Sequence, residues 1–231
     1  MKQNRQSKIV AIVALCISVL GLTLGFAAFS NTLTISSSAT VSPDEADFKI
    51  TVLGLNQGAF KDGDSIGDVI FDLNNYNQTS SYPKVNYDRV TATPAVIDNE
   101  NLTLKNLSAS LIKDDDSAVY YFVLRNDGEY DAYFDVASLS DLYEGKTGTC
   151  TPAAGTSADL VNQTCSSIKL QMMLASDDGE IDMSTVDKYE IKKGDYIYLV
   201  VGVRYDSATV YADGDFSVSF EDLKLEFSTT K

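Results

Sequence analysis

The chain has 231 residues with 33 acidic and 18 basic side chains, a formal net charge of −15 and no histidine. This charge disfavours binding to nucleic acid or to anionic membranes, and the lack of histidine excludes Ser-His-Asp triads, HExxH zinc sites and histidine acid–base catalysis. A hydrophobic fraction of 44% with 13 Tyr and 10 Phe is enough for a core, so we expect a folded protein that is not an enzyme.

The N-terminus has the pattern of an export signal. Residues 1–8 carry three basic side chains and no acid, and residues 9–29 form an uncharged apolar run that ends in small residues. This pattern predicts a signal peptide with cleavage around Ala27, Ala28 and Ser30. An apolar run of this length can also span about 30 Å of hydrocarbon as a helix and stay as a membrane anchor. In both cases residues 30–231 are expected outside the cytoplasm, extracellular or at the cell surface.

Export would make the chain more acidic. Removal of residues 1–27 leaves fifteen basic side chains against thirty-three acidic ones, a net charge near −18. Mutual repulsion then keeps monomers apart, and salt or cations relieve it.

Residues 30–46 form an extended segment that could join one copy to another. Phe29, Leu33, Ile35 and Val41 are apolar and are separated by Thr and Ser. After cleavage, such a chain end can add as a strand to the exposed sheet edge of a second copy, and repetition in one direction grows a filament. The alternative is a flexible Ser/Thr stalk, or a strand of the chain's own domain.

From residue 47 onward, short apolar runs rich in β-branched and aromatic residues alternate with Gly, Asp and Asn. No convincing amphipathic helix of twelve residues follows Phe29, so residues 47–231 are predicted as one antiparallel β-sandwich or jelly roll. A long loop is expected from 74 to 86, and a slip in the alternation near Leu107 predicts a bulge. The predicted strands cover residues 48–55, 68–73, 102–112, 118–126, 130–139, 168–174, 196–205, 215–220 and 223–227.

Two cysteines lie in this region. Cys150 and Cys165 flank a run of small and polar residues that is predicted as a loop. In an oxidising exterior we expect one disulfide that closes the loop; the alternative is two free thiols. Metal ligation is not expected from two sulfurs without histidine.

The acidic clusters allow two interpretations. Asp177, Asp178, Glu180 and Asp182 could collect a hard cation such as Ca²⁺ through carboxylate oxygens, although their spacing does not follow the EF-hand. A carboxylate pair there, or within residues 114–116, could also hydrolyse glycosides. The plainer interpretation is solvated turns between strands, so no catalytic residue and no cofactor are predicted.

Two stretches resemble a known family. The strings GLTLGFAAFSNTLTISSSATVSP and LTLKNLSASLIKDDDSAVYYFVLRNDGEYDAYFDV are similar to the signal region and to a strand–acidic turn–strand pattern of the TasA/camelysin family. The resemblance covers about twenty-five residues closely and about forty more loosely. It implies cleavage by a SipW-type signal peptidase and a secreted jelly-roll subunit of biofilm matrix fibres. Some members are described as metalloproteases, an activity that a chain without histidine does not support.

Together, these features predict an exported structural protein that builds extracellular matrix fibres. Its expected partners are further copies of itself, other matrix or cell-surface components, and signal peptidase during export. Nucleic acid is not an expected partner, and the membrane is one only through residues 9–29 if these are retained. A membrane-tethered binding or adhesion module is the alternative, and an extracellular hydrolase comes third.

Overall fold

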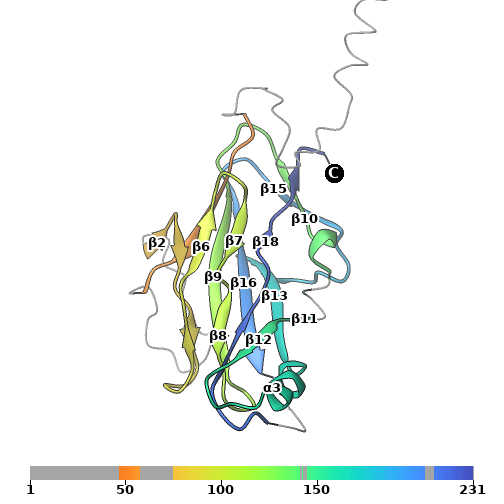
Figure 1. Cartoon of the computed structure of the whole chain (residues 1–231). Helices are drawn as coiled ribbons and strands as arrows, with labels where there is room; N and C mark the ends of the chain where they lie inside the picture. Colours follow the sequence, from red (N-terminus) through yellow and green to blue (C-terminus); the bar gives the residue numbers. More distant parts are fainter. Residues whose placement is uncertain (1–46, 58–74, 141, 143–144, 206–210, 231) are drawn as a thin grey trace, which may run out of the picture. The chain divides into compact units, whose positions relative to one another are not determined.

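The computed structural model describes residues 47–57, 75–140, 142, 145–205 and 211–230 (Figure 1). All of these except Thr230 belong to a unit that spans Ile35–Thr229. The signal segment, the extended segment 30–46 and the predicted strand 68–73 lie outside the described residues. No helix among the described residues is both long enough and apolar enough to cross a membrane.

The described chain is built mainly of antiparallel β-strands, as predicted. Its largest sheet contains three long strands whose apolar runs are buried, and its order is β11-β13-β16-β9-β1-β2, with β14 added to β13 and β4 added to β9. The strands of this sheet are β1 (Ile50–Leu55), β2 (Tyr76–Asn77), β4 (Lys84–Val85), β9 (Ser117–Asn126), β11 (Lys146–Thr147), β13 (Ile168–Ser176), β14 (Gly179–Ile181) and β16 (Tyr196–Tyr205).

Three smaller sheets share one hydrophobic core with the large sheet. Alternate residues of β9, such as Tyr120 and Phe122, enter this core, while Tyr121 and Val123 belong to smaller clusters. Because neighbouring strand residues point to opposite faces, β9 is buried on both faces of its sheet. The small sheets are β15 (Lys188–Ile191)-β10 (Ala132–Asp135)-β19 (Phe227–Ser228), β12 (Thr149–Pro152)-β17 (Phe216–Ser219)-β8 (Ser108–Ser110)-β5 (Thr91–Ala92), and β18 (Leu223–Lys224)-β7 (Thr103–Lys105)-β6 (Ala95–Asp98)-β3 (Ser80–Ser81).

The predicted slip near Leu107 is confirmed. The predicted strand 102–112 is divided into β7 and β8, and Asn106 between them has a left-handed backbone with φ of 61°. Asparagine tolerates this conformation better than most residues. Leu107 turns into the core, with 1% of its surface exposed.

The predicted loop 74–86 is wrong, because it contains β2, β3 and β4. Its polar sequence gives no strand pattern. The three short strands form because they pair with buried strands elsewhere in the chain. The backbone of Ser80 lies so close to Gly54 that a Cβ atom there would sit 2.2 Å from the Ser80 carbonyl oxygen. The predicted strand 130–139 is also shorter than expected: β10 ends at Asp135 and a 3-10 helix, η4 (Ala137–Leu139), follows.

The disulfide between Cys150 and Cys165 is confirmed, with the two Cα atoms 5.9 Å apart. The segment between them is more ordered than the predicted loop, since it holds part of β12 and a helix, α3 (Ala158–Cys165). The hydroxyl of Ser157 caps this helix by accepting the Leu160 N–H at 3.4 Å. Val161 on α3 enters the shared core, so the disulfide fastens a packed element.

We predict that Cys150→Ser lowers the melting temperature by several degrees. Loss of the bond frees the unfolded chain between the two cysteines, which corresponds to roughly 3 kcal/mol on chain-entropy grounds. Differential scanning calorimetry of the oxidised protein measures the effect. Equal melting temperatures for Cys150→Ser and the wild type would contradict it.

A buried carboxylate holds the acidic turn that precedes β9. Asp116 Oδ2 accepts the N–H of Ile112 at 2.8 Å and that of Lys113 at 3.0 Å, while Oδ1 pairs with Arg89. Burial raises the pKa of Asp116, but Arg89 and the two N–H groups outweigh it and hold the pKa below its usual value. The turn is therefore fixed by an ionised group that is fully covered.

We predict that Asp116→Ala lowers the free energy of unfolding by about 2–4 kcal/mol, because it leaves Arg89 and two N–H groups without their acceptor. Since the folded pKa is depressed, this stabilisation is present above the unfolded pKa of about 3.9 and is lost as pH falls through the folded pKa. Urea denaturation at pH 7 and pH 3 measures both effects. The matched control is Asp115→Asn, an exposed neighbour whose left-handed φ of 69° suits asparagine. A loss as large in the control would contradict the role given to Asp116.

Candidate functional site

The edge strand β18 ends one of the small sheets. β17 and β18 follow each other along the chain and pair on one side with β8 and β7. On its other side β17 pairs with β12, from Thr149 opposite Ser219 to Pro152 opposite Phe216. No strand of the described chain continues β12 alongside β18. Among the described strands, β18 therefore has a partner on one side only, β7.

Gly148 explains why β12 begins at Thr149 and does not extend alongside β18. Residues 146–147 pair with β13 of the large sheet, whereas β12 belongs to a small sheet, so the chain crosses from one to the other at Gly148. A Cβ atom on Gly148 would lie 2.6 Å from a methyl carbon of Val218 and 2.8 Å from the ring of Phe220. Only glycine fits this crossing.

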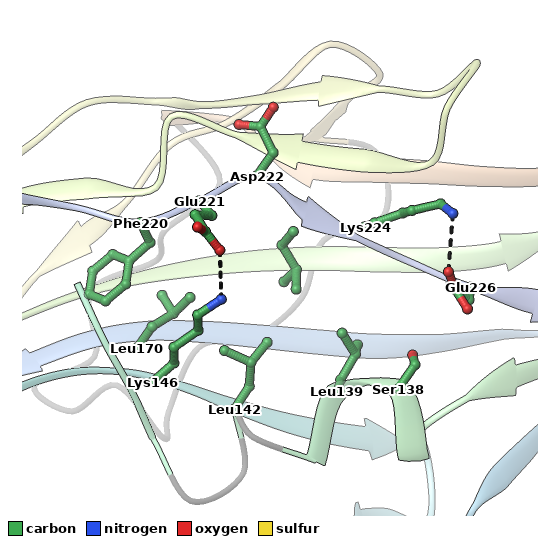
Figure 2. A pocket seen from close by; sticks show the side chains of 11 residues that line it. Ser138, Leu139, Leu142, Lys146, Leu170, Phe220, Glu221, Asp222, Lys224 and Glu226 are labelled. Carbon is green, nitrogen blue, oxygen red and sulfur yellow. Dashed lines mark hydrogen bonds and ion pairs between the residues drawn. The ribbon is translucent and has the colours of Figure 1, made fainter. Parts of the chain in front are cut away.

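A pocket of about 270 Å³ lies beside the open edge of β18 (Figure 2). Figure 2 shows the chain from Phe220 to Glu226 along one side, with η4, Leu142 and β11 facing it. The lining combines apolar side chains with a charged rim. The apolar residues are Leu139, Leu142, Leu170, Phe220 and Leu223, and the polar ones are Ser138, Lys146, Glu221, Asp222, Lys224 and Glu226.

Two ion pairs mark the rim. Lys146 Nζ reaches across from β11 to Glu221 Oε2 at 2.9 Å, and Lys224 Nζ at the end of β18 contacts Glu226 Oε1, two residues further along the chain, at 3.1 Å (Figure 2). Hydrogen bonding to Lys146 lowers the pKa of Glu221. All four side chains are exposed by 40% or more, so these pairs add little stability and can rearrange.

This arrangement suits an apolar side chain carried by an added strand. The pocket is slightly smaller than a typical small-molecule site, and its apolar lining lies beside a strand edge that can form main-chain hydrogen bonds. Charged side chains such as Lys224 discourage indiscriminate pairing at an edge.

The four acidic residues considered for a cation are not brought together. Asp177 accepts hydrogen bonds from Tyr196 at 3.2 Å and from Tyr198 at 3.4 Å. Asp182 accepts from both the N–H and the hydroxyl of Ser184, which lowers its pKa. Within the described ranges, no three Cys, Asp or Glu side chains are grouped so that they could hold a metal ion.

The other predicted site residues lie outside the described residues. They are the cleavage residues Ala27, Ala28 and Ser30 and the polymerisation residues Phe29, Leu33, Ile35 and Val41. The pocket itself was missed in the sequence. The available signal was the break between the predicted strands 215–220 and 223–227, where Glu221 and Asp222 interrupt the apolar pattern.

Comparison of the chain with protein families, with curated proteins and with solved structures finds no match. A functional proposal therefore rests on the edge of β18 and on its pocket.

Proposed function

We propose that this protein is an exported subunit of an extracellular fibre, with a jelly-roll sandwich formed by the large sheet and the three small sheets. In this proposal residues 29–41 of one copy add as a strand to β18 of the next copy. The observation that carries it is the edge of β18, unpaired on its outer side within the described chain, beside a pocket that five apolar and six polar residues line. The resemblance to TasA/camelysin sequences supports the same export route and the same class of function.

The strand directions are compatible with this addition. Ile50 pairs with Asn126, and Asp127 and Glu129 donate their N–H groups to Lys49 and Asp47, so the N-terminal segment joins the domain at this end. We call residues 47–49, 126–131 and 191–195 the entry end. β18 runs toward the entry end, because it is antiparallel to β7, which leads through β8 away from that end. A segment that leaves one copy and lies along the next, stacked above it, therefore runs antiparallel to β18.

The segment is also long enough. At about 3.3 Å per residue, residues 29–46 can span about 60 Å when extended. The ten residues of β9 correspond to about 30 Å. The segment can pass the half of the next copy that holds α3 and still cover β18.

The pocket supplies the specificity of the contact. Leu33 and Ile35 lie on the same side of an extended segment, so one of them can enter the pocket while the main chain bonds to β18. Burial of such a side chain contributes about 1.5–3 kcal/mol, and each main-chain hydrogen bond about 1 kcal/mol. A charged side chain at the same position would enter the apolar lining without a partner.

We predict that the processed chain forms filaments in salt and that deletion of residues 29–41 abolishes them without unfolding the domain. Leu33→Asp or Ile35→Asp is expected to act nearly like the deletion, because a charge would have to be buried. Thr34→Asp, on the opposite side of the strand, is expected to be much milder. Negative-stain electron microscopy gives the comparison, with melting temperature as the folding control. Filaments from the deletion variant would contradict the proposal that residues 29–41 join the copies. The membrane-tethered module would then be preferred.

We predict that Ser138→Trp, which fills the pocket from its rim, raises the concentration needed for filaments at least tenfold. Ser140→Trp is the matched control, because Ser140 is also exposed but does not line the pocket. Light scattering at a series of protein concentrations measures the threshold. Equal thresholds for the two variants would show that the pocket does not receive the added strand.

A further inference from the structure

The strand β12 covers one half of a sheet edge whose other half has no partner in the described chain. β17 and β18 belong to one stretch of chain that pairs along its inner side with β8 and β7. Between the two strands, the Phe220 N–H donates to the Leu107 carbonyl at 3.1 Å, so the inner side stays bonded. Among the described strands, β12 is the partner of β17 on the outer side. If β12 were absent, the unpaired edge at β18 would extend along β17.

The side chains of β12 hold it only weakly on β17. Thr149 and Thr151 are exposed, and Cys150 and Pro152 are half-buried, so no side chain of β12 is fully covered. Cys150 is the member of β12 that packs against the shared hydrophobic core. Pro152 has no N–H to donate to β17. Because burial of apolar side chains is the main force that keeps an element in place, β12 depends on its main-chain pairing and on the bond at Cys150.

The turn after β12 adds hydrogen bonds at the surface. The Ala153 N–H donates to the Asp215 carbonyl at 2.9 Å, and the Thr156 hydroxyl donates to the same carbonyl at 3.0 Å. Ala153 and Asp215 are exposed, so water can replace both bonds when the strand opens. The net contribution of such bonds to stability is small.

The other cysteine of the disulfide belongs to a firmly held element. Cys165 is the last residue of α3, and Val161 and Thr164 of this helix are fully buried. Ile168, which begins β13 of the large sheet, is also fully buried. Cys165 Sγ lies 3.5 Å from the carbonyl oxygen of Gly148, directly before β12. The disulfide therefore ties a weakly held strand to a firmly held helix, at the point where the chain changes sheets.

We propose that the disulfide is the clamp that keeps β12 on β17, so that its redox state determines how much of this sheet edge is covered. With the bond formed, β12 covers β17 and the unpaired edge is confined to β18. With the bond reduced, β12 separates from β17 more often and the unpaired edge extends along β17. The clamp itself does not depend on the proposed fibre. Its consequence for assembly does: oxidation would confine the added strand to β18.

Reduction of the clamp is an exchange with a dithiol such as dithiothreitol. A thiolate of the reagent attacks Cys150 Sγ, the more exposed of the two sulfurs, and the bond to Cys165 Sγ breaks. The released Cys165 sulfur takes up a proton. The second thiol of the reagent then displaces Cys150, which also takes up a proton, and the reagent closes to a cyclic disulfide. Two electrons thus pass from the dithiol to the two cysteines.

Hydrogen exchange of single amides tests the clamp, because β17 contains its own control. The main-chain groups of an antiparallel strand point alternately to its two neighbours. The Phe220 N–H bonds on the inner side, so the Val218 N–H also points inward, to β8. The N–H groups of Ser217 and Ser219 point to β12.

The processed chain is compared by nuclear magnetic resonance in its oxidised form and after reduction with dithiothreitol, at low ionic strength, where repulsion keeps copies apart. Loss of the bond lowers the stability of the whole domain, so the protection of all these amides falls. The clamp predicts that the protection of Ser217 and Ser219 falls at least tenfold further than that of Val218. An equal fall at all three amides would overturn the inference and leave the proposed fibre untouched.

A second clamp keeps the test decisive if reduction unfolds the domain. In a chain whose two native cysteines are replaced by serine, Thr151→Cys and Ser217→Cys allow a new disulfide directly between β12 and β17. These two residues are exposed and lie opposite each other, a pairing whose Cα atoms are about 5.5 Å apart, within the range of a disulfide. Once formed, the new bond should return the protection of Ser219, relative to that of Val218, to the value of the oxidised wild type. A new bond that leaves Ser219 at least tenfold less protected would overturn the inference.

Discussion

The crossing at Gly148 is the constraint on which the open edge depends. A side chain there would collide with Val218 and Phe220, so the chain can pass from the large sheet to β12 only with glycine at this point. The crossing ends the strand that pairs with β17 and leaves β18, within the described chain, with β7 as its neighbour on one side only. The same step places Lys146 opposite Glu221, so that the gap becomes a pocket with a charged rim rather than a bare edge.

The strand order also makes the two ends of the domain different from each other. The N-terminal segment joins at the entry end, whereas the disulfide-bonded helix α3 and the Asp116 turn lie toward the opposite end (Figure 1). In the proposed contact the donor segment and the acceptor edge are different surfaces. Addition in one direction would therefore grow a filament, whereas reciprocal exchange between two copies would close a dimer.

The sequence predicts the long strands well and the site poorly, for one physical reason. β9, β13 and β16 are recognisable because burial requires continuous or alternating apolar runs. β2, β3 and β4 are two-residue strands whose order comes from partners distant in the sequence, such as Gly54. The pocket combines residues from η4, β11, β13 and β18, and no local pattern indicates that these segments meet. The disulfide could be predicted because it depends on two cysteines close in the sequence and on an oxidising compartment, rather than on periodicity.

In the proposed fibre, the acidic charge and the edge of β18 would together control when one copy adds to another. If the chain adds to its own sheet edge as proposed, addition before export has to be avoided, and a net charge of −15 favours separate copies. General repulsion cannot select a register, however. In the proposal, that selection falls to short-range features: a pocket of mixed polar and apolar lining that would receive one side chain, and a rim whose exposed ion pairs can rearrange. In the proposed fibre, repulsion at long range combined with a specific contact at short range would make growth slow to begin and ordered once it has begun.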